Sequence, residues 1–92
     1  MKTYQISVDN FTGNAPCPDV LPVEGQELTI VVPFVTLARK MYFAGDKLKL
    51  VRRTKQAPHG RVSSLGNWVV QCPHMISIWT NIEWMMAEGT VK

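Results

Sequence analysis

Three short stretches of alternating apolar and polar residues constrain the fold of this chain more than any other feature. They are residues 3–8, 47–53 and 75–80. Apolar side chains recur at every second position in each stretch, which is the period of a half-buried β-strand. Small domains close or cover their sheets because exposed strand edges pair with other chains. The sequence therefore predicts a mainly β fold, a small barrel of about five antiparallel strands.

The first strand should span residues 3–8 and be followed by a long loop. Its buried face should carry Tyr4, Ile6 and Val8. Residues 9–26 are rich in Gly, Pro, Asn and Asp, which favour turns and withhold backbone donors, so we expect a loop there. Three apolar residues should pin this loop to the core, namely Val20, Leu21 and Val23.

Residues 27–32 predict a second strand, and the segment after it allows two interpretations. The strand is rich in β-branched residues and should stop at Pro33, which has no N–H for a ladder. Apolar residues then follow at helical spacing, at Phe34, Leu37, Ala38 and Met41. One interpretation is an α+β fold with an extra helix over 33–43, since Pro33 suits a first helical position. The other is a long strand carried through a bulge.

The second half of the chain predicts a strand and a hairpin. Residues 46–53 should form a strand with Leu48 and Leu50 inward, and residues 54–60 a loop. Residues 68–72 and 75–79 are both strand-like, and the connector between them contains proline, so they predict a hairpin. One face of its first strand should carry Trp68, Val70 and Cys72.

A short helix over 81–88 is expected near the C-terminus. The sequence Thr80-Asn81-Ile82-Glu83 has the form of a capping box, and Gly89 can end the helix in the left-handed conformation. The helix should bury Ile82, Met85 and Met86 and leave Glu83 and Glu88 in solvent. Residues 90–92 are expected to add a last short strand.

Size and composition predict one folded domain over residues 1–92. Hydrophobic residues make up 46% and charged residues 18% of the chain, which favours a globule over a disordered tail. The longest apolar run, residues 30–35, is interrupted by Pro33 and is too short to cross a bilayer. The N-terminal residues lack the apolar stretch of a signal peptide, so we expect a cytoplasmic protein with no membrane association.

The cysteines and histidines do not predict a metal site, a cofactor or a catalytic centre. Only Cys72-Pro73-His74 brings two such residues close in sequence, whereas structural zinc usually has paired ligands. Cys72 alternates onto the same face as Trp68 and Val70, so we expect it to be packed rather than reactive. No phosphate-cradling loop or carboxylate pair is recognisable. We therefore expect a protein that is not an enzyme, with no cofactor.

The segment Phe43-Ala44-Gly45-Asp46-Lys47-Leu48-Lys49-Leu50-Val51 resembles the Gly-Asp entry to a strand in SH3-like small barrels of the KOW type. The order of predicted elements over 43–92 is similar to theirs. The resemblance implies a small barrel that binds rather than catalyses. The segment Trp79-Thr80-Asn81-Ile82-Glu83-Trp84 resembles small uncharacterised proteins of tailed bacteriophages, which implies a phage-encoded modulator of a host factor.

Positive charge is concentrated in one block, and this block predicts the binding surface. Eight of the ten Lys and Arg residues lie between Arg39 and Arg61, against one acid, Asp46. Such a surface can meet an acidic protein or a nucleic acid, or be a solvated face. Its candidate contact residues are Lys47, Lys49, Arg52, Arg53, Lys55 and Arg61.

Two tryptophans extend the candidate surface. Trp79 alternates opposite to Ile76 and Ile78, so it either faces solvent beside the basic strand or packs under the C-terminal helix. Trp84 lies off the apolar stripe of that helix, which favours an interface with a partner or a second copy of the chain.

The leading hypothesis is a non-enzymatic protein that binds an acidic protein partner. The alternative is a small barrel that binds nucleic acid through the basic residues of 47–61, with bases stacked on Trp79.

Overall fold

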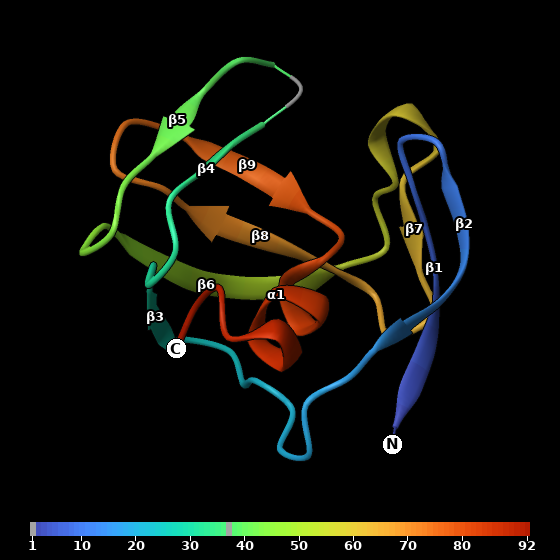
Figure 1. The fold of residues 1–92 in the computed structure, drawn as a ribbon. Coiled ribbons are helices and arrows are strands. Elements are labelled where there is room, and N and C mark those ends of the chain that lie inside the picture. The colour runs from blue at the N-terminus through green and yellow to red at the C-terminus, as the bar shows by residue number, and fades with distance from the viewer. Residues whose placement is uncertain (1, 37) are drawn as a thin grey trace.

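The computed structural model describes residues 2–36 and 38–92 (Figure 1). In chain order its elements are β1 (Thr3–Val8), β2 (Phe11–Pro16), β3 (Glu27–Thr29), β4 (Phe34–Val35), β5 (Met41–Tyr42), β6 (Lys47–Thr54), the 3-10 turn η1 (Pro58–Gly60), β7 (Val62–Ser63), β8 (Asn67–Gln71), β9 (Ile76–Trp79) and α1 (Ile82–Glu88). No helix in these described ranges is long and apolar enough to cross a membrane.

The strands form three antiparallel sheets, with orders β2-β1-β7, β3-β6-β8-β9 and β4-β5. Helix α1 lies between the two larger sheets (Figure 1). The mainly β fold and its C-terminal helix are therefore confirmed. The strands do not close into a barrel, because the two edges of the four-stranded sheet, β3 and β9, make no ladder with each other in the described part of the chain.

The first sheet contains a strand that the sequence did not predict. Residues 3–8 are a strand as expected, but β2 folds back along β1, with Tyr4 paired to Ala15. Gly13, Asn14 and Pro16 obscured this strand, and they are tolerated because β2 is an edge strand and Pro16 is its last residue. The expected pinning residues of the next loop are exposed instead, namely Val20, Leu21 and Val23.

Residues 33–43 do not form the alternative helix. Their described residues form the β4–β5 hairpin, in which Phe34 pairs with Tyr42 and stacks on its ring at 5.1 Å between centroids. Thr36 donates its N–H to the Lys40 carbonyl at 3.0 Å close to the turn, and Arg39 has a positive φ of 60°. Leu37, one of the residues at helical spacing, lies outside the described residues. The helical spacing was coincidental, because cross-strand packing of the aromatic rings decided the conformation.

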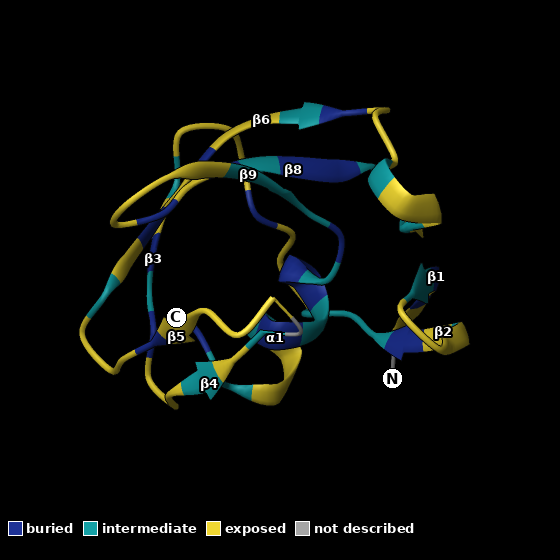
Figure 2. Ribbon diagram, turned by 90° about the horizontal axis from the view of Figure 1, so that it is seen from above, coloured by how far each residue is buried: buried dark blue, intermediate teal, exposed yellow. Residues whose placement is uncertain are grey.

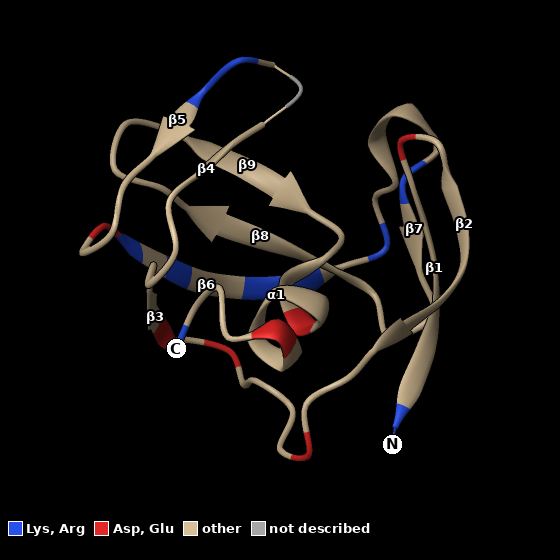
Figure 3. Ribbon diagram, viewed as in Figure 1, with Lys and Arg blue, Asp and Glu red and all other residues tan. Residues whose placement is uncertain are grey.

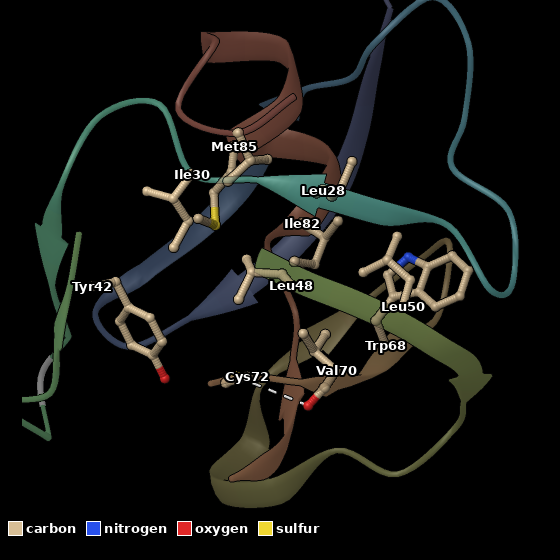
Figure 4. Close-up of a cluster of buried hydrophobic side chains, with 11 residues drawn as sticks. Leu28, Ile30, Tyr42, Leu48, Leu50, Trp68, Val70, Cys72, Ile82 and Met85 are labelled. Atoms are coloured by element: carbon tan, nitrogen blue, oxygen red, sulfur yellow. Dashed lines mark hydrogen bonds between the residues drawn. The ribbon is translucent and has the colours of Figure 1, made fainter. Parts of the chain in front are cut away.

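The main core lies between the inner face of the four-stranded sheet and α1 (Figure 4). Leu48 and Leu50 are completely buried, which confirms the predicted alternation in β6. Trp68, Val70 and Cys72 are all buried, and β8 and β9 form the predicted hairpin. Figure 2 shows the dark blue, buried colour concentrated in β8 and α1.

Helix α1 forms as predicted, but its capping box does not. Gly89 ends the helix with a φ of 80°, while the N-cap residue, Asn81, makes no side-chain cap hydrogen bond. Glu83 was expected in solvent and is completely buried; its carboxylate accepts a hydrogen bond from Trp68 Nε1 at 2.9 Å. A buried indole N–H requires an acceptor, and Glu83 supplies it instead of capping the helix.

The last residues pair as expected. Val91 forms an antiparallel bridge with Ile30, and Thr29 and Lys92 exchange two backbone hydrogen bonds.

Candidate protein-docking surface

The outer face of the four-stranded sheet gathers the unburied side chains of β6, β8 and β9. We call this surface the outer sheet face, and its members are Lys47, Lys49, Val51, Arg52, Val69, Gln71, Ile76 and Ile78. Cross-strand register places them together: Lys49 opposes Gln71, Gln71 opposes Ile76, and Arg52 opposes Val69. Directly opposed residues of a sheet share a face, so these rows form one continuous surface.

Basic residues recur along β6, as the blue bands in Figure 3 show. Lys47, Lys49 and Arg52 are exposed, and no ion pair involves them within residues 2–36 and 38–92. Lys47 donates from Nζ to the Thr29 hydroxyl at 2.6 Å, and Lys49 opposes Glu27 in the register of β3. The three cations are therefore in solvent, with one acid, Glu27, at the margin of the face.

Apolar side chains lie beside these cations. Ile76 is 64% exposed and Val51 39% exposed, and Val69 and Ile78 are half-buried. The alternation in residues 46–53 placed Val51 outward, which its exposure confirms. Sequence reasoning placed Ile76 and Ile78 on one face but did not identify Ile76 as a surface residue. The outer sheet face therefore exposes apolar side chains next to long basic side chains.

Arg53 was predicted on this face and instead lies on the inner side of the sheet. A β-bulge between Leu50 and Arg52 inserts one residue, so the alternation reverses after Val51. Arg53 then opposes Trp68, with its guanidinium 4.3 Å from the indole centroid, and pairs with the Glu83 carboxylate at 2.7 Å. This arginine is structural and does not belong to the outer sheet face.

The two other predicted basic residues lie away from the sheet. Lys55 is exposed in the loop after β6. Arg61 is half-buried and forms an ion pair with Asp9 in the turn between β1 and β2, at 2.8 Å. The predicted basic block is therefore divided in space, and its sheet portion is limited to Lys47, Lys49 and Arg52.

Neither predicted tryptophan is an exposed anchor. Trp79 opposes Trp68, so its ring lies on the inner side and contacts Phe34 and Tyr42 at centroid distances of 6.0 and 5.4 Å. Of the two positions that the sequence allowed for Trp79, the structure has the packed one, so the ring does not form the exposed platform expected for base stacking. The sequence correctly placed Trp79 on the face opposite to Ile76 and Ile78. The pairing of Trp79 with the buried Trp68 decided that the tryptophan face is the inner one.

Trp84 joins α1 to the first sheet. Its ring packs on Phe11 at 5.1 Å between centroids, and its backbone N–H donates to the Tyr4 hydroxyl at 3.3 Å. It packs against the second core cluster, whose buried members are Tyr4, Ile6 and Ala15. Trp84 is an internal junction and not part of a docking surface.

Neither cysteine lies in surroundings that favour a reactive thiolate. Cys72 is buried with its thiol directed at the Val70 carbonyl at 3.9 Å, which confirms that it is packed. Cys17 and Cys72 are both free thiols. Burial raises the pKa of the Cys17 thiol, which disfavours the nucleophilic thiolate. Within residues 2–36 and 38–92, no group of three or more potential metal ligands converges.

Tyr42, a buried residue of β5, should make the free energy of unfolding depend on pH in the alkaline range. Burial, followed by the neighbouring Cys72 thiol, raises the pKa of Tyr42 from 10.0 to about 12. Because this folded-state pKa exceeds the unfolded value, folding favours the neutral phenol. The resulting stabilisation is complete below the unfolded pKa and is lost as the pH rises toward the folded one.

We expect the free energy of unfolding to fall less steeply with pH in Tyr42→Phe than in the unmodified protein, over about pH 10 to 12. Urea titrations at a series of alkaline pH values measure this. Burial also raises the pKa of Tyr4, so Tyr4→Phe/Tyr42→Phe should flatten the dependence further. Equal slopes for the unmodified protein and Tyr42→Phe would show that folding does not depress ionisation of this phenol.

Comparison with known proteins found no matching family model, no similar curated protein and no similar solved structure. The functional interpretation therefore depends on the geometry of the surface itself.

Proposed function

We propose that this chain is a non-enzymatic protein that binds an acidic protein partner through the outer sheet face. The observation that carries the proposal is the row of solvated Lys47, Lys49 and Arg52 beside the exposed apolar side chains of Val51 and Ile76. A partner with carboxylates around an apolar centre would complement both parts of this surface. The resemblance to SH3-like small barrels and to phage proteins agrees with a binding role and with a host factor as the partner.

Protein is favoured over nucleic acid because the face offers aliphatic side chains and no aromatic ring. Nucleic-acid surfaces that bind single strands combine cations with exposed aromatic platforms. The described members of the outer sheet face include no aromatic residue, and Trp79 is turned inward. An apolar side chain as exposed as that of Ile76 contributes more to binding a protein surface than to binding a nucleic acid.

The test is affinity capture with charge-reversed variants. Lys49→Glu/Arg52→Glu should weaken the binding of the captured acidic protein by about tenfold or more. The matched control, Lys2→Glu/Lys55→Glu, makes the same change in net charge at exposed residues away from the face and should retain the partner. An unchanged set of captured proteins in the first variant would refute the proposed surface.

The apolar part of the face has its own prediction. Ile76→Ser should weaken the binding of the same partner roughly tenfold, because an exposed apolar side chain contributes to the affinity when the interface removes it from water. Its effect on the free energy of unfolding should be within about 0.5 kcal/mol, since the residue is 64% exposed. Titration calorimetry and urea unfolding measure the two effects separately. Loss of stability without loss of binding would assign Ile76 to the fold.

Nucleic acid is the competing outcome. Fluorescence anisotropy with labelled single- and double-stranded oligonucleotides at several salt concentrations decides it. Tight, strongly salt-dependent binding that Lys49→Glu/Arg52→Glu abolishes, together with no captured protein, would replace the proposal with nucleic-acid binding.

A further inference from the structure

The free edge of β9 is bordered by a groove. Among residues 2–36 and 38–92, β9 is the last strand of its sheet and pairs only with β8. A cavity of about 590 Å³ is lined on one side by residues of the segment from Met75 to Asn81 and on the other by the β4–β5 hairpin. This volume falls in the range of protein sites that bind ligands, about 300 to 1,000 Å³. The groove therefore runs beside an unpaired strand edge.

The backbone of β9 presents unpaired groups along this edge. Cys72 donates its N–H to the Met75 carbonyl at 2.7 Å, which identifies their pair as hydrogen-bonded. Hydrogen-bonded and non-hydrogen-bonded pairs alternate in an antiparallel ladder, so Ser77 and Trp79 bond to β8. Ile76 and Ile78 direct their N–H and C=O groups away from β8. Among the described residues, no backbone hydrogen bond links these two to another segment.

The groove wall contains an aromatic cluster and polar side chains, with a cation on the hairpin side. Phe34, Tyr42 and Trp79 pack ring against ring, so they form a continuous aromatic wall and leave no cage between them. Lys40 lies on the hairpin side, where its Nζ contacts Met75 Sδ. Arg61 also lines the groove, with its charge already paired to Asp9.

We propose that an extended segment of a partner protein adds to β9 as an antiparallel fifth strand. Donors and acceptors repeated every two residues match another backbone, which is the basis of strand addition. Alternate side chains of the segment would be apolar and face the aromatic wall, and an acidic side chain would pair with Lys40. The other side chains would continue the outer sheet face beside Ile76 and Ile78. The proposal rests on the proposed function, that the chain binds a protein.

The experiment uses peptides selected from a random seven-residue display library on the immobilised full chain. The selected peptide is synthesised with one backbone N-methyl group at each position in turn. N-methylation at alternate positions should weaken binding by about tenfold or more, because those amides face β9, and at the intervening positions it should have little effect. Amide hydrogen exchange at Ile76 and Ile78 should slow when the unmodified peptide binds.

Ile78→Pro provides the matching change in the protein. It removes an N–H that points to the groove, so the β8–β9 ladder should survive while peptide binding is lost. Ile78→Val keeps the N–H and should bind normally. If Ile78→Pro does not fold, the N-methyl series on the unmodified protein still decides.

Three outcomes would overturn strand addition: no peptide selected above background, an N-methyl series without alternation, or protection of Ile76 and Ile78 by dimerisation of the chain alone. The proposed function fails separately, by capture that does not respond to Lys49→Glu/Arg52→Glu. The two results can also differ. If N-methylation shows no alternation but capture of the partner still depends on Lys49 and Arg52, the outer sheet face remains the docking surface and strand addition is rejected.

Discussion

Replacing Glu83 with alanine should lower the free energy of unfolding by about 3 kcal/mol. The Glu83 side chain is completely buried, and its Oε2 accepts from Trp68 Nε1 and from Arg53 Nη1. Removing the carboxylate leaves the Trp68 indole N–H without an acceptor and the Arg53 guanidinium without its counter-ion, although Arg53 still donates to the Gly66 carbonyl. Arg53 is 27% exposed, so water recovers part of the loss, which is why we expect less than the largest values for a fully buried pair. Urea unfolding followed by circular dichroism measures the change.

Two further variants identify the cause of that loss. Glu88→Ala changes an exposed carboxylate of the same helix and should alter stability by less than about 0.5 kcal/mol. Arg53→Met/Glu83→Leu replaces the ion pair with apolar groups and should recover part of the stability, because neither charge is then left buried alone while the Trp68 N–H still lacks its acceptor. A Glu83→Ala protein as stable as Glu88→Ala would mean that the buried carboxylate does not hold the helix to the sheet.

Trp68→Ala should lower the free energy of unfolding by about 4 kcal/mol. Trp68 is 1% exposed and fills the core between β8 and α1 (Figure 4). The change opens a cavity, removes the ring under the Arg53 guanidinium and leaves the Glu83 carboxylate without its indole donor. Domains of this size have total stabilities of roughly 5 to 14 kcal/mol, so a large part of the margin would be lost. Thermal and urea unfolding measure it.

Trp84→Ala is the matched control for Trp68→Ala. Trp84 is half-buried at the junction of α1 with β2, so its removal should lower the free energy of unfolding by roughly 1 to 2 kcal/mol. If Trp84→Ala proved as damaging as Trp68→Ala, the junction between the sheets would be as important as the main core.

The sequence was informative wherever a strand had one buried face and no irregularity. The alternation of Tyr4 and Ile6, of Leu48 and Leu50, and of Trp68 with Val70 predicted the inner residues correctly. In these strands one face must be buried, so a period of two determines each side chain's side. The C-terminal helix was also predictable, because Gly89 allows its left-handed end.

The candidate site was less predictable because two features depend on tertiary contacts. The bulge after Leu50 turned Arg53 from the basic surface to Glu83, and nothing in the local pattern marks a bulge there. The inner position of Trp79 depends on its pairing with Trp68 across β8 and β9. In β9 the same alternation results whether Trp79 or the Ile76–Ile78 pair faces the core. Alternation alone therefore does not determine which face of the strand is buried.

Two short hairpins were missed for a different reason. β2 contains glycine, asparagine and proline, which individually favour turns, and it is held by pairing with β1. The β4–β5 hairpin has strands of two residues each, too short to show a period. Cross-strand pairing within each hairpin decides the conformation of such segments, whereas the propensities of single residues do not.

Site-specific photocrosslinking tests most directly whether the outer sheet face is the docking surface. A photoreactive phenylalanine analogue in place of Ile76 should crosslink to an acidic protein, and Lys49→Glu/Arg52→Glu in the same chain should abolish the product. The same analogue in place of Thr12, an exposed residue of β2 on the other sheet, should give no such product. A crosslink from position 12 but not from position 76, or a product at position 76 that contains only nucleic acid, would contradict the proposal.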